Sequence, residues 1–111
     1  MKCFIRANNI ELPVSLRRFI VNRIEKTFSR VNDKVRFVVV SFQDINGFRG
    51  GNDKRCKVKV IGENSIQVHV FDTHSCEKTA FSKALKRAQQ SFQERIQKLA
   101  HRLRRNVILV P

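Results

Sequence analysis

Apolar and polar residues alternate with a period of two in two segments near the middle of the chain. In Lys54–Ile61 (KRCKVKVI) small apolar residues alternate with cations, and in Ser65–Phe71 (SIQVHVF) β-branched residues alternate with Gln and His. This period is typical of a β-strand, whose successive side chains point to opposite faces. Both segments are therefore predicted to be strands with one apolar and one polar face, joined by a turn at Gly62–Asn64.

Two other segments have apolar residues at helical spacing. From Pro13 to Val31 these residues fall close to a single stripe, and Asn32-Asp33 is expected to end the helix. Pro13 suits the first turn, because the amide hydrogen that it lacks would have no helical partner there. A longer stripe runs from Ser75 to Arg105. A helix of about 28 residues is roughly 42 Å long, which is enough to cross a sheet and overhang it.

Two further segments, Lys2–Ala7 (KCFIRA) and Val35–Phe42 (VRFVVVSF), have the composition of strands, and the second is expected to be buried on much of both faces. The order β-α-β-β-β-α predicts an α+β fold, a two-layer sandwich with two helices on one face of a four-stranded mixed sheet. A chain of 111 residues has room for one core. We therefore expect a single domain over residues 1–105 and an apolar tail over residues 106–111, whose role the sequence leaves open.

The segment NGFRGGNDKRC, Asn46–Cys56, has the glycine and charge content of a phosphate-binding loop. Such a loop needs a fixed glycine frame between a strand and a helix, but here the frame is missing and a strand follows. The segment is therefore predicted to be a hairpin connection whose glycines supply positive φ angles. Its cations Arg49, Lys54 and Arg55 either contact a phosphate backbone or are ordinary solvated surface.

The charge balance narrows the choice of partner. The chain has 23 Lys and Arg against 9 Asp and Glu, a formal net charge of +14, and a pI near 10.9. Such an excess opposes compactness and indicates an anionic partner, which for a small chain is most often nucleic acid rather than a membrane or an acidic protein. The sequence has neither a membrane-spanning apolar run nor a secretory signal, so we expect a cytoplasmic protein without membrane contact.

The cations concentrate on the predicted helices and on one strand. Residues 75–105 carry nine Lys and Arg against two Glu, a net charge of +7, with few of the alternating signs that a salt-bridged face would have. Lys83, Lys86, Arg87 and Gln90 have the spacing of a single helix face, although a merely solvated face stays open. The strand cations are expected to point away from the helices, so that the basic surface wraps around an edge. The predicted RNA-binding residues are Arg17, Arg23, Lys26, Arg49, Lys54, Arg55, Lys57, Lys59, Lys78, Lys83, Lys86, Arg87 and Gln90.

The aromatic content bears on the kind of nucleic acid. The sequence has no Trp or Tyr, and most of the nine Phe fall on the predicted core stripes. This argues against a stacking platform for single strands and favours recognition of structured RNA by its shape and backbone. DNA is not an expected partner, because both helices bury a wide stripe and leave cations rather than Asn or Gln to read base edges.

Patterns for catalysis or metal binding are weak. Asp44, Asp53, Asp72, His74 and Cys76 are the candidate cluster, and a lone His-x-Cys is far short of the four-ligand spacing of a zinc site. The chain is therefore predicted not to be an enzyme and to hold no cofactor or metal. The three cysteines are odd in number and widely spaced, which is typical of buried thiols in a reducing compartment.

Two stretches resemble a known family. NIEL at Asn9–Leu12, followed by LRRFIVNRIEK at residues 16–26, resembles the opening of the ribosome hibernation promoting factor family, which includes ribosome-associated inhibitor A. TAFSKALKRAQQSFQERI, residues 79–96, resembles the second helix of that family. In element order the resemblance covers nearly the whole chain.

The resemblance implies a fold similar to that of double-stranded RNA-binding domains. It also implies binding to the small ribosomal subunit and its rRNA, in the channel used by messenger and transfer RNA, so that idle ribosomes are silenced under stress. The family's basic positions would fall on Arg17, Arg23, Lys26, Lys83, Lys86 and Arg87, with Gln90 where Arg or Lys is common. Because no dimer-forming domain follows, the chain is similar to the short form of the family, and we expect a monomer when it is free.

The sequence departs from that family at the start of both helices. Pro13-Val14 stand where Thr-Pro is usual, and Ser75-Cys76-Glu77 stand where Asp-Met-Tyr is usual. An acidic tail is also absent, so it stays open whether ribosomes would be paired or only blocked. Two other functions also stay open: a generic double-stranded RNA-binding module, and a regulator that binds a protein through its apolar tail.

Overall fold

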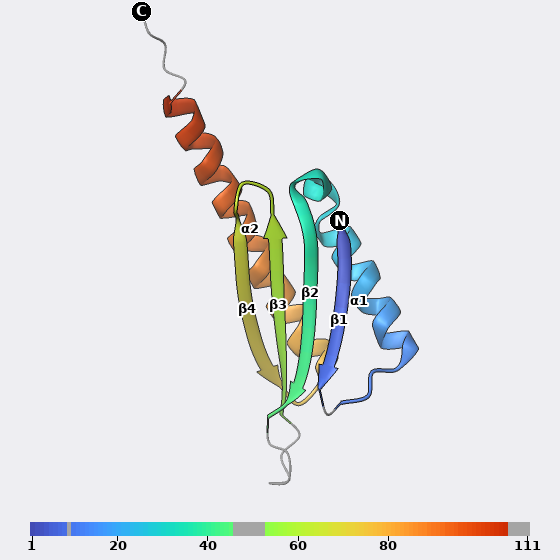
Figure 1. Cartoon of the computed structure of the whole chain (residues 1–111). Helices are drawn as coiled ribbons and strands as arrows, with labels where there is room; N and C mark the ends of the chain where they lie inside the picture. Colours follow the sequence, from blue (N-terminus) through green and yellow to red (C-terminus); the bar gives the residue numbers. More distant parts are fainter. Residues whose placement is uncertain (9, 46–52, 107–111) are drawn as a thin grey trace, which may run out of the picture.

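The computed structural model describes residues 1–8, 10–45 and 53–106, with the backbone alone for 104–106. Its four-stranded sheet has the order β1-β2-β3-β4, and β1 pairs parallel to β2 while the other neighbours pair antiparallel. The helices α1 (Val14–Thr27) and α2 (Glu77–Asn106) both lie on one face of the sheet (Figure 1). The predicted α+β sandwich with a mixed sheet is therefore confirmed. The strands are β1 Lys2–Asn8, β2 Val35–Asp44, β3 Lys54–Gly62 and β4 Gln67–His74.

The core fills the space between the sheet and the helices. The helix-facing side chains of β2, β3 and β4 are buried, and they meet the apolar stripes that the sequence predicted on α1 and α2. Large aromatic side chains close the layer, with Phe28 and Phe92 packed edge to face at a centroid distance of 6.0 Å. Burial of these side chains is the main force that holds the helices on this face.

The first helix is shorter than predicted. It ends at Thr27 rather than near Val31, and a 3₁₀ helix, η1 (Ser29–Lys34), follows it. The Ser29 hydroxyl donates a hydrogen bond to the Lys26 carbonyl (3.0 Å), and Val31 has a non-helical backbone. Val31 still packs against the core from this backbone, which is why the apolar stripe continues past the end of the helix.

The last hairpin begins its second strand later than predicted. Asn64 and Ser65 have φ angles of 58° and 64°, so they form the turn, and β4 runs from Gln67 to His74 instead of Ser65 to Phe71. In the same hairpin, a Cβ placed on Gly62 would lie 2.7 Å from the Phe92 ring. Glycine at this position therefore permits the close approach of β3 and α2.

The opposite face of the sheet is not covered by α1 or α2. Strand β2 is fully buried only on its helix-facing side, and Phe37, Val39 and Ser41 on the other side are half-buried. The prediction that this strand is buried on much of both faces therefore holds fully on the helix-facing side and in part on the other side. Phe4 and Phe71 also point away from the helices and are 48% and 58% exposed. Phe28, Phe42, Phe81 and Phe92 are buried and Phe19 packs against them, so the expectation that most Phe side chains belong to the core is confirmed. Phe4, Phe37 and Phe71 are the exceptions on this face.

The segment after β2 joins neighbouring antiparallel strands, because Asp44 pairs with Lys54 and the Ile45 amide donates to the Asp53 carbonyl (3.3 Å). The predicted strand-to-strand connection is therefore confirmed. The glycines and Arg49 within residues 46–52 lie outside the described residues, as do residues 107–111 of the predicted tail. Within the described part, neither helix combines the length and apolar content needed to cross a bilayer.

Candidate nucleic-acid interface

A groove of about 340 Å³ lies between the end of α1, the start of η1 and the middle of α2. The Gln89 amide ties its two sides together by donating a hydrogen bond to the Thr27 carbonyl (3.3 Å). We call this feature the interhelical groove. It is lined by Arg23, Lys26, Thr27, Ser29, Arg30, Val31, Gln89 and Gln93.

The interhelical groove is positively charged. Arg23, Lys26 and Arg30 are all exposed, and its described lining includes no Asp or Glu. Guanidinium and ammonium groups bind phosphate oxygens, and the amides of Gln89 and Gln93 are donors for phosphate or sugar oxygens. The chemistry of the groove thus suits a polyanionic backbone. Of the predicted site residues, the structure brings Arg23 and Lys26 together here.

The cations predicted to share one face of α2 point in different directions. Lys86 precedes Gln89 and Gln93 by three and seven residues, the spacing that places all three along one side of the helix. Arg87 turns the other way, since its Nη1 donates to the Phe71 carbonyl (3.1 Å) on β4. Lys83 and Gln90 are exposed. The face predicted from spacing alone therefore splits between the groove side and the sheet edge.

Two of the predicted cations contact the chain itself. The Arg17 Nε donates to the Leu12 carbonyl at 3.4 Å, next to the start of α1. The Lys78 Nζ lies 4.4 Å from the centroid of the Phe19 ring and so joins the start of α2 to α1. The first contact fixes the segment before α1, and the second joins the two helices, so both side chains take part in contacts within the domain.

The strand cations are divided between the two faces of the sheet. The Lys54 side chain is on the helix-facing side, 18% exposed, and its Nζ lies 4.0 Å from the Asp44 carboxylate. Arg55 is on the opposite face, together with Lys57 and Lys59. Lys54 and Arg55 both lie at the start of β3, but they point to opposite faces, because adjacent residues of a strand alternate.

The sequence reasoning missed Arg30, Gln89 and Gln93 as lining residues of the groove. The spacing of the two glutamines relative to Lys86 was a usable signal. Arg30 carried the same signal, because it follows Lys26 by four and Arg23 by seven residues within the segment predicted to be helical.

The candidate catalytic cluster is occupied by structural contacts. Asp72 pairs with Arg87 (3.5 Å), Asp44 pairs with Lys54, and the Nδ1 of His74 accepts a hydrogen bond from the Cys76 amide (3.1 Å). The described residues include no group of three or more His, Cys, Asp or Glu side chains suited to a metal ion. These contacts lie near strand ends and in the turn before α2.

Two thiols differ in their ionisation. Burial, and to a lesser degree the charge of Asp72, raises the pKa of Cys56 to about 12. Cys76 is exposed at the start of α2, and hydrogen bonds from the Thr79 backbone and side chain lower its pKa. The expectation of buried thiols therefore holds for Cys56 and is wrong for Cys76.

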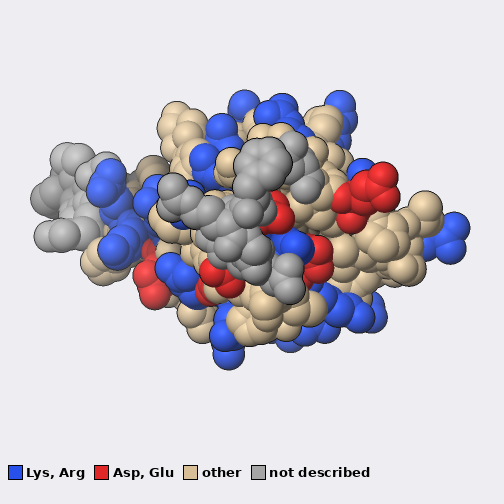
Figure 2. Space-filling view, turned by 90° about the horizontal axis from the view of Figure 1, so that it is seen from below, with Lys and Arg blue, Asp and Glu red and all other residues tan. Residues whose placement is uncertain are grey.

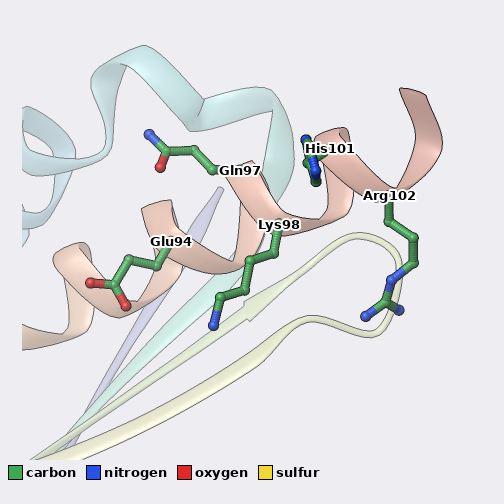
Figure 3. A pocket seen from close by; sticks show the side chains of 5 residues that line it. All are labelled: Glu94, Gln97, Lys98, His101 and Arg102. Carbon is green, nitrogen blue, oxygen red and sulfur yellow. The ribbon is translucent and has the colours of Figure 1, made fainter. Parts of the chain in front are cut away.

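A second hollow, of about 450 Å³, lies along the outer half of α2. Figure 3 shows that Glu94, Gln97, Lys98, His101 and Arg102 all come from this one helix and spread along it without converging on a point. The hollow is a feature of the helix surface, and it is not a closed site for a ligand.

The positive charge forms more than one patch. In Figure 2, Lys and Arg side chains lie around most of the rim of the molecule, and Asp and Glu side chains interrupt them in several places. The interhelical groove belongs to the helix layer, whereas Arg55, Lys57 and Lys59 belong to the uncovered sheet face. The two basic surfaces are therefore on opposite sides of the two-layer sandwich.

No protein-family model and no curated protein matches the sequence. Solved structures do match the fold. A ribosomal subunit interface protein from Coxiella burnetii has a TM-score of 0.67 at 10% identity, over 85% of this chain and 96% of that one. The N-terminal domain of Protein Y from Thermus thermophilus has a TM-score of 0.67 at 16% identity, over 84% and 93% of the two chains. The α+β fold implied by the resemblance to the hibernation promoting factor family is thus confirmed, and the chain shares its fold with these two proteins.

Proposed function

We propose that this protein is a ribosome-associated translation inhibitor that binds rRNA of the small subunit in the cytoplasm and silences idle ribosomes. The interhelical groove is the main contact in this proposal. Its cations Arg23, Lys26 and Arg30 bind phosphates, and the rest of the domain occupies the channel that messenger and transfer RNA would use.

One observation carries the proposal. The groove has three exposed cations and no acidic residue in its described lining, in a fold shared with a protein named for the ribosomal subunit interface. Folded RNA is recognised mainly through its shape, its phosphates and its 2′-hydroxyls, and the groove offers donors for these groups. Inhibition then needs no catalytic group, because a bound domain excludes other ligands by its volume.

Charge reversal in the groove tests this proposal. Lys26→Glu and Arg30→Glu together should abolish co-sedimentation with the small subunit and the inhibition of translation in a cell-free system. The matched control is Lys98→Glu with Arg102→Glu, which changes the net charge equally on the outer half of α2 (Figure 3). The control should retain both activities, and equal loss in both pairs would show that net charge alone drives binding.

A generic double-stranded RNA-binding module would use the same backbone contacts. A competition experiment with duplex RNA distinguishes the two functions. An excess of unrelated duplex RNA should leave ribosome binding nearly unchanged if the ribosome is the partner, and should remove it if any duplex suffices. We expect ribosome binding to persist in the presence of the competing duplex RNA and to be lost in the groove variant.

A further inference from the structure

The uncovered face of the sheet carries aromatic and cationic side chains in alternation. We call it the open face, and it consists of the outward-pointing residues of the four strands. Neither helix covers it (Figure 1). The residues that define it are Lys2, Phe4, Arg6, Asn8, Phe37, Val39, Ser41, Gln43, Arg55, Lys57, Lys59, Ile61, Gln67, His69, Phe71 and Thr73.

The strand register sets the spacing of the aromatic rings. Phe4 is level with Lys59 and His69, and the next row contains Lys57 and Phe71. Strands lie about 4.8 Å apart, so β1 and β4 are separated by about 14 Å across the sheet. Phe4 and Phe71 lie on these two outer strands in adjacent rows, with lysines between them, which leaves room for several flat groups bound side by side.

The ring contacts on this face are few and open to solvent. Phe4 meets Phe37 edge to face at a centroid distance of 6.0 Å, and Arg55 lies over the Phe71 ring at 5.4 Å. Phe71 is nevertheless 58% exposed. A hollow of about 370 Å³ adjoins it, within the range of small-ligand sites. The lining of this hollow is Ser41, Gln43, Arg55, Lys57, His69 and Phe71.

The open face has a positive potential. Its residues include five Lys and Arg and no Asp or Glu, all of them within the described strands. The pKa of His69 is lowered, first by partial burial and then by the charges of Lys59, Lys57 and Arg95. Cations that disfavour a further positive charge favour a negative ligand in the same place.

We propose that the open face binds single-stranded RNA, with unpaired bases stacked on Phe4 and Phe71 and phosphates held by Lys57 and Lys59. A four-stranded sheet with exposed aromatic residues stacks two or three bases in a common class of RNA-binding module. A duplex does not suit this face, because its paired bases present no free ring to stack.

A protein partner would find this face less suitable. Lysine is depleted in the core of protein–protein interfaces, whereas here Lys57 and Lys59 lie between the aromatic rings. Single-stranded RNA uses both kinds of side chain, because its bases stack and its phosphates need counter-charges. The inference goes beyond the proposed function, because it adds an RNA surface on the side of the sheet opposite to the interhelical groove.

Binding of a labelled, short oligouridylate to the full chain tests this proposal, with fluorescence anisotropy as the readout. Phe71→Leu keeps an apolar side chain and removes the aromatic ring, so it should weaken binding about tenfold. Phe71→Tyr keeps the ring and should stay within about twofold of the parent protein. Leu103→Ala is the control, because it removes apolar surface on α2 that is also exposed (52%). Its affinity for the oligouridylate should equal that of the parent protein.

A matched pair of charge variants separates the two surfaces. Lys57→Gln with Lys59→Gln should weaken binding of the oligouridylate more than Lys26→Gln with Arg30→Gln, although both remove two charges. Circular dichroism checks that each variant is folded. Equal losses in the two pairs, or no loss in Phe71→Leu, would overturn the proposal and leave the groove function untouched. Self-association that Phe71→Leu abolishes, without any binding of the oligouridylate, would assign the face to a second copy instead.

Discussion

The guanidinium of Arg87 on α2 lies 3.5 Å from the carboxylate of Asp72 on β4 and also donates to the Phe71 carbonyl. This contact ties the helix to the edge strand. Reversing the charge of Arg87 would therefore disturb the fold, because a glutamate at position 87 would face Asp72. Lys83 and Lys86 can be reversed without that conflict.

Replacing Arg87 should lower stability in a graded manner. The Arg87 side chain is 59% exposed, so the contact contributes at most about 1 kcal/mol, and Arg87→Ala should cost no more than that. Arg87→Glu should cost more, because it adds repulsion. Urea unfolding measures both, and Lys83→Glu, which is exposed, is the control expected to have little effect. Equal stability of the two Arg87 variants would contradict a specific role for Asp72.

Gly62→Ala should destabilise the domain by about 1–3 kcal/mol. The new methyl group would lie 2.7 Å from the Phe92 ring and 3.0 Å from the Lys34 carbonyl oxygen. Phe92 is fully buried against Phe28, so it has little room to move. The midpoint of urea unfolding should fall with an unchanged slope.

Ser65→Gly in the same hairpin is the opposite control. Ser65 has a φ of 64°, which glycine adopts without cost, so this change should raise stability by up to about 1 kcal/mol. If both substitutions lowered stability equally, the effect would belong to the turn as a whole and not to the contact with Phe92.

The thiols should react with iodoacetamide in a fixed order. Only the thiolate reacts, so the lowered pKa and the exposure of Cys76 make it the first site. Below its pKa, its labelling rate should fall about tenfold for each pH unit. Cys56, buried and with a pKa of about 12, should stay unlabelled near neutral pH. Peptide mass spectrometry of timed samples gives the order.

Thr79→Val is the companion variant for the thiol experiment. It removes a hydroxyl that hydrogen-bonds Cys76 and keeps the side-chain shape, so the pKa of Cys76 should rise and its labelling at neutral pH should slow. Cys56 should be unaffected. An unchanged rate at Cys76 would assign its lowered pKa to the backbone amides alone.

Binding through the interhelical groove should depend strongly on salt. Each phosphate neutralised by a cation adds a released counterion, so Lys26→Ala should reduce the slope of log affinity against log salt by about one. Titration of small subunits at several salt concentrations measures the slope. Lys98→Ala on the outer half of α2 should keep the parent slope (Figure 3). If the Lys26 variant kept the salt slope of the parent protein, Lys26 would not belong to the interface.

The hydrophobic pattern was sufficient to predict the elements and their layers. Alternation with a period of two marked β3 and β4, and the stripe between Ser75 and Arg105 marked α2. These signals are local, because the face that a residue occupies within one strand or helix follows from its position alone. The boundary of α1 was less predictable, since Val31 packs against the core from a non-helical backbone and so continues the apolar stripe.

The candidate site was only partly predictable. Spacing placed the cations on the correct elements, but it carried no information on which elements face each other. The interhelical groove forms where residues of α1, η1 and α2 meet, and Arg87 is directed to β4 by its contact with Asp72.

The sequence by itself determined a basic α+β sandwich, because charge is a sum over residues and amphipathic periods are local. Only the tertiary structure decided that Phe4 and Phe71, which are distant in the chain, share an uncovered face. The physical reason is that both helices pack on one side of the sheet and leave the outward residues of the strands exposed. Which charges and rings act together is therefore a property of strand register and layer packing.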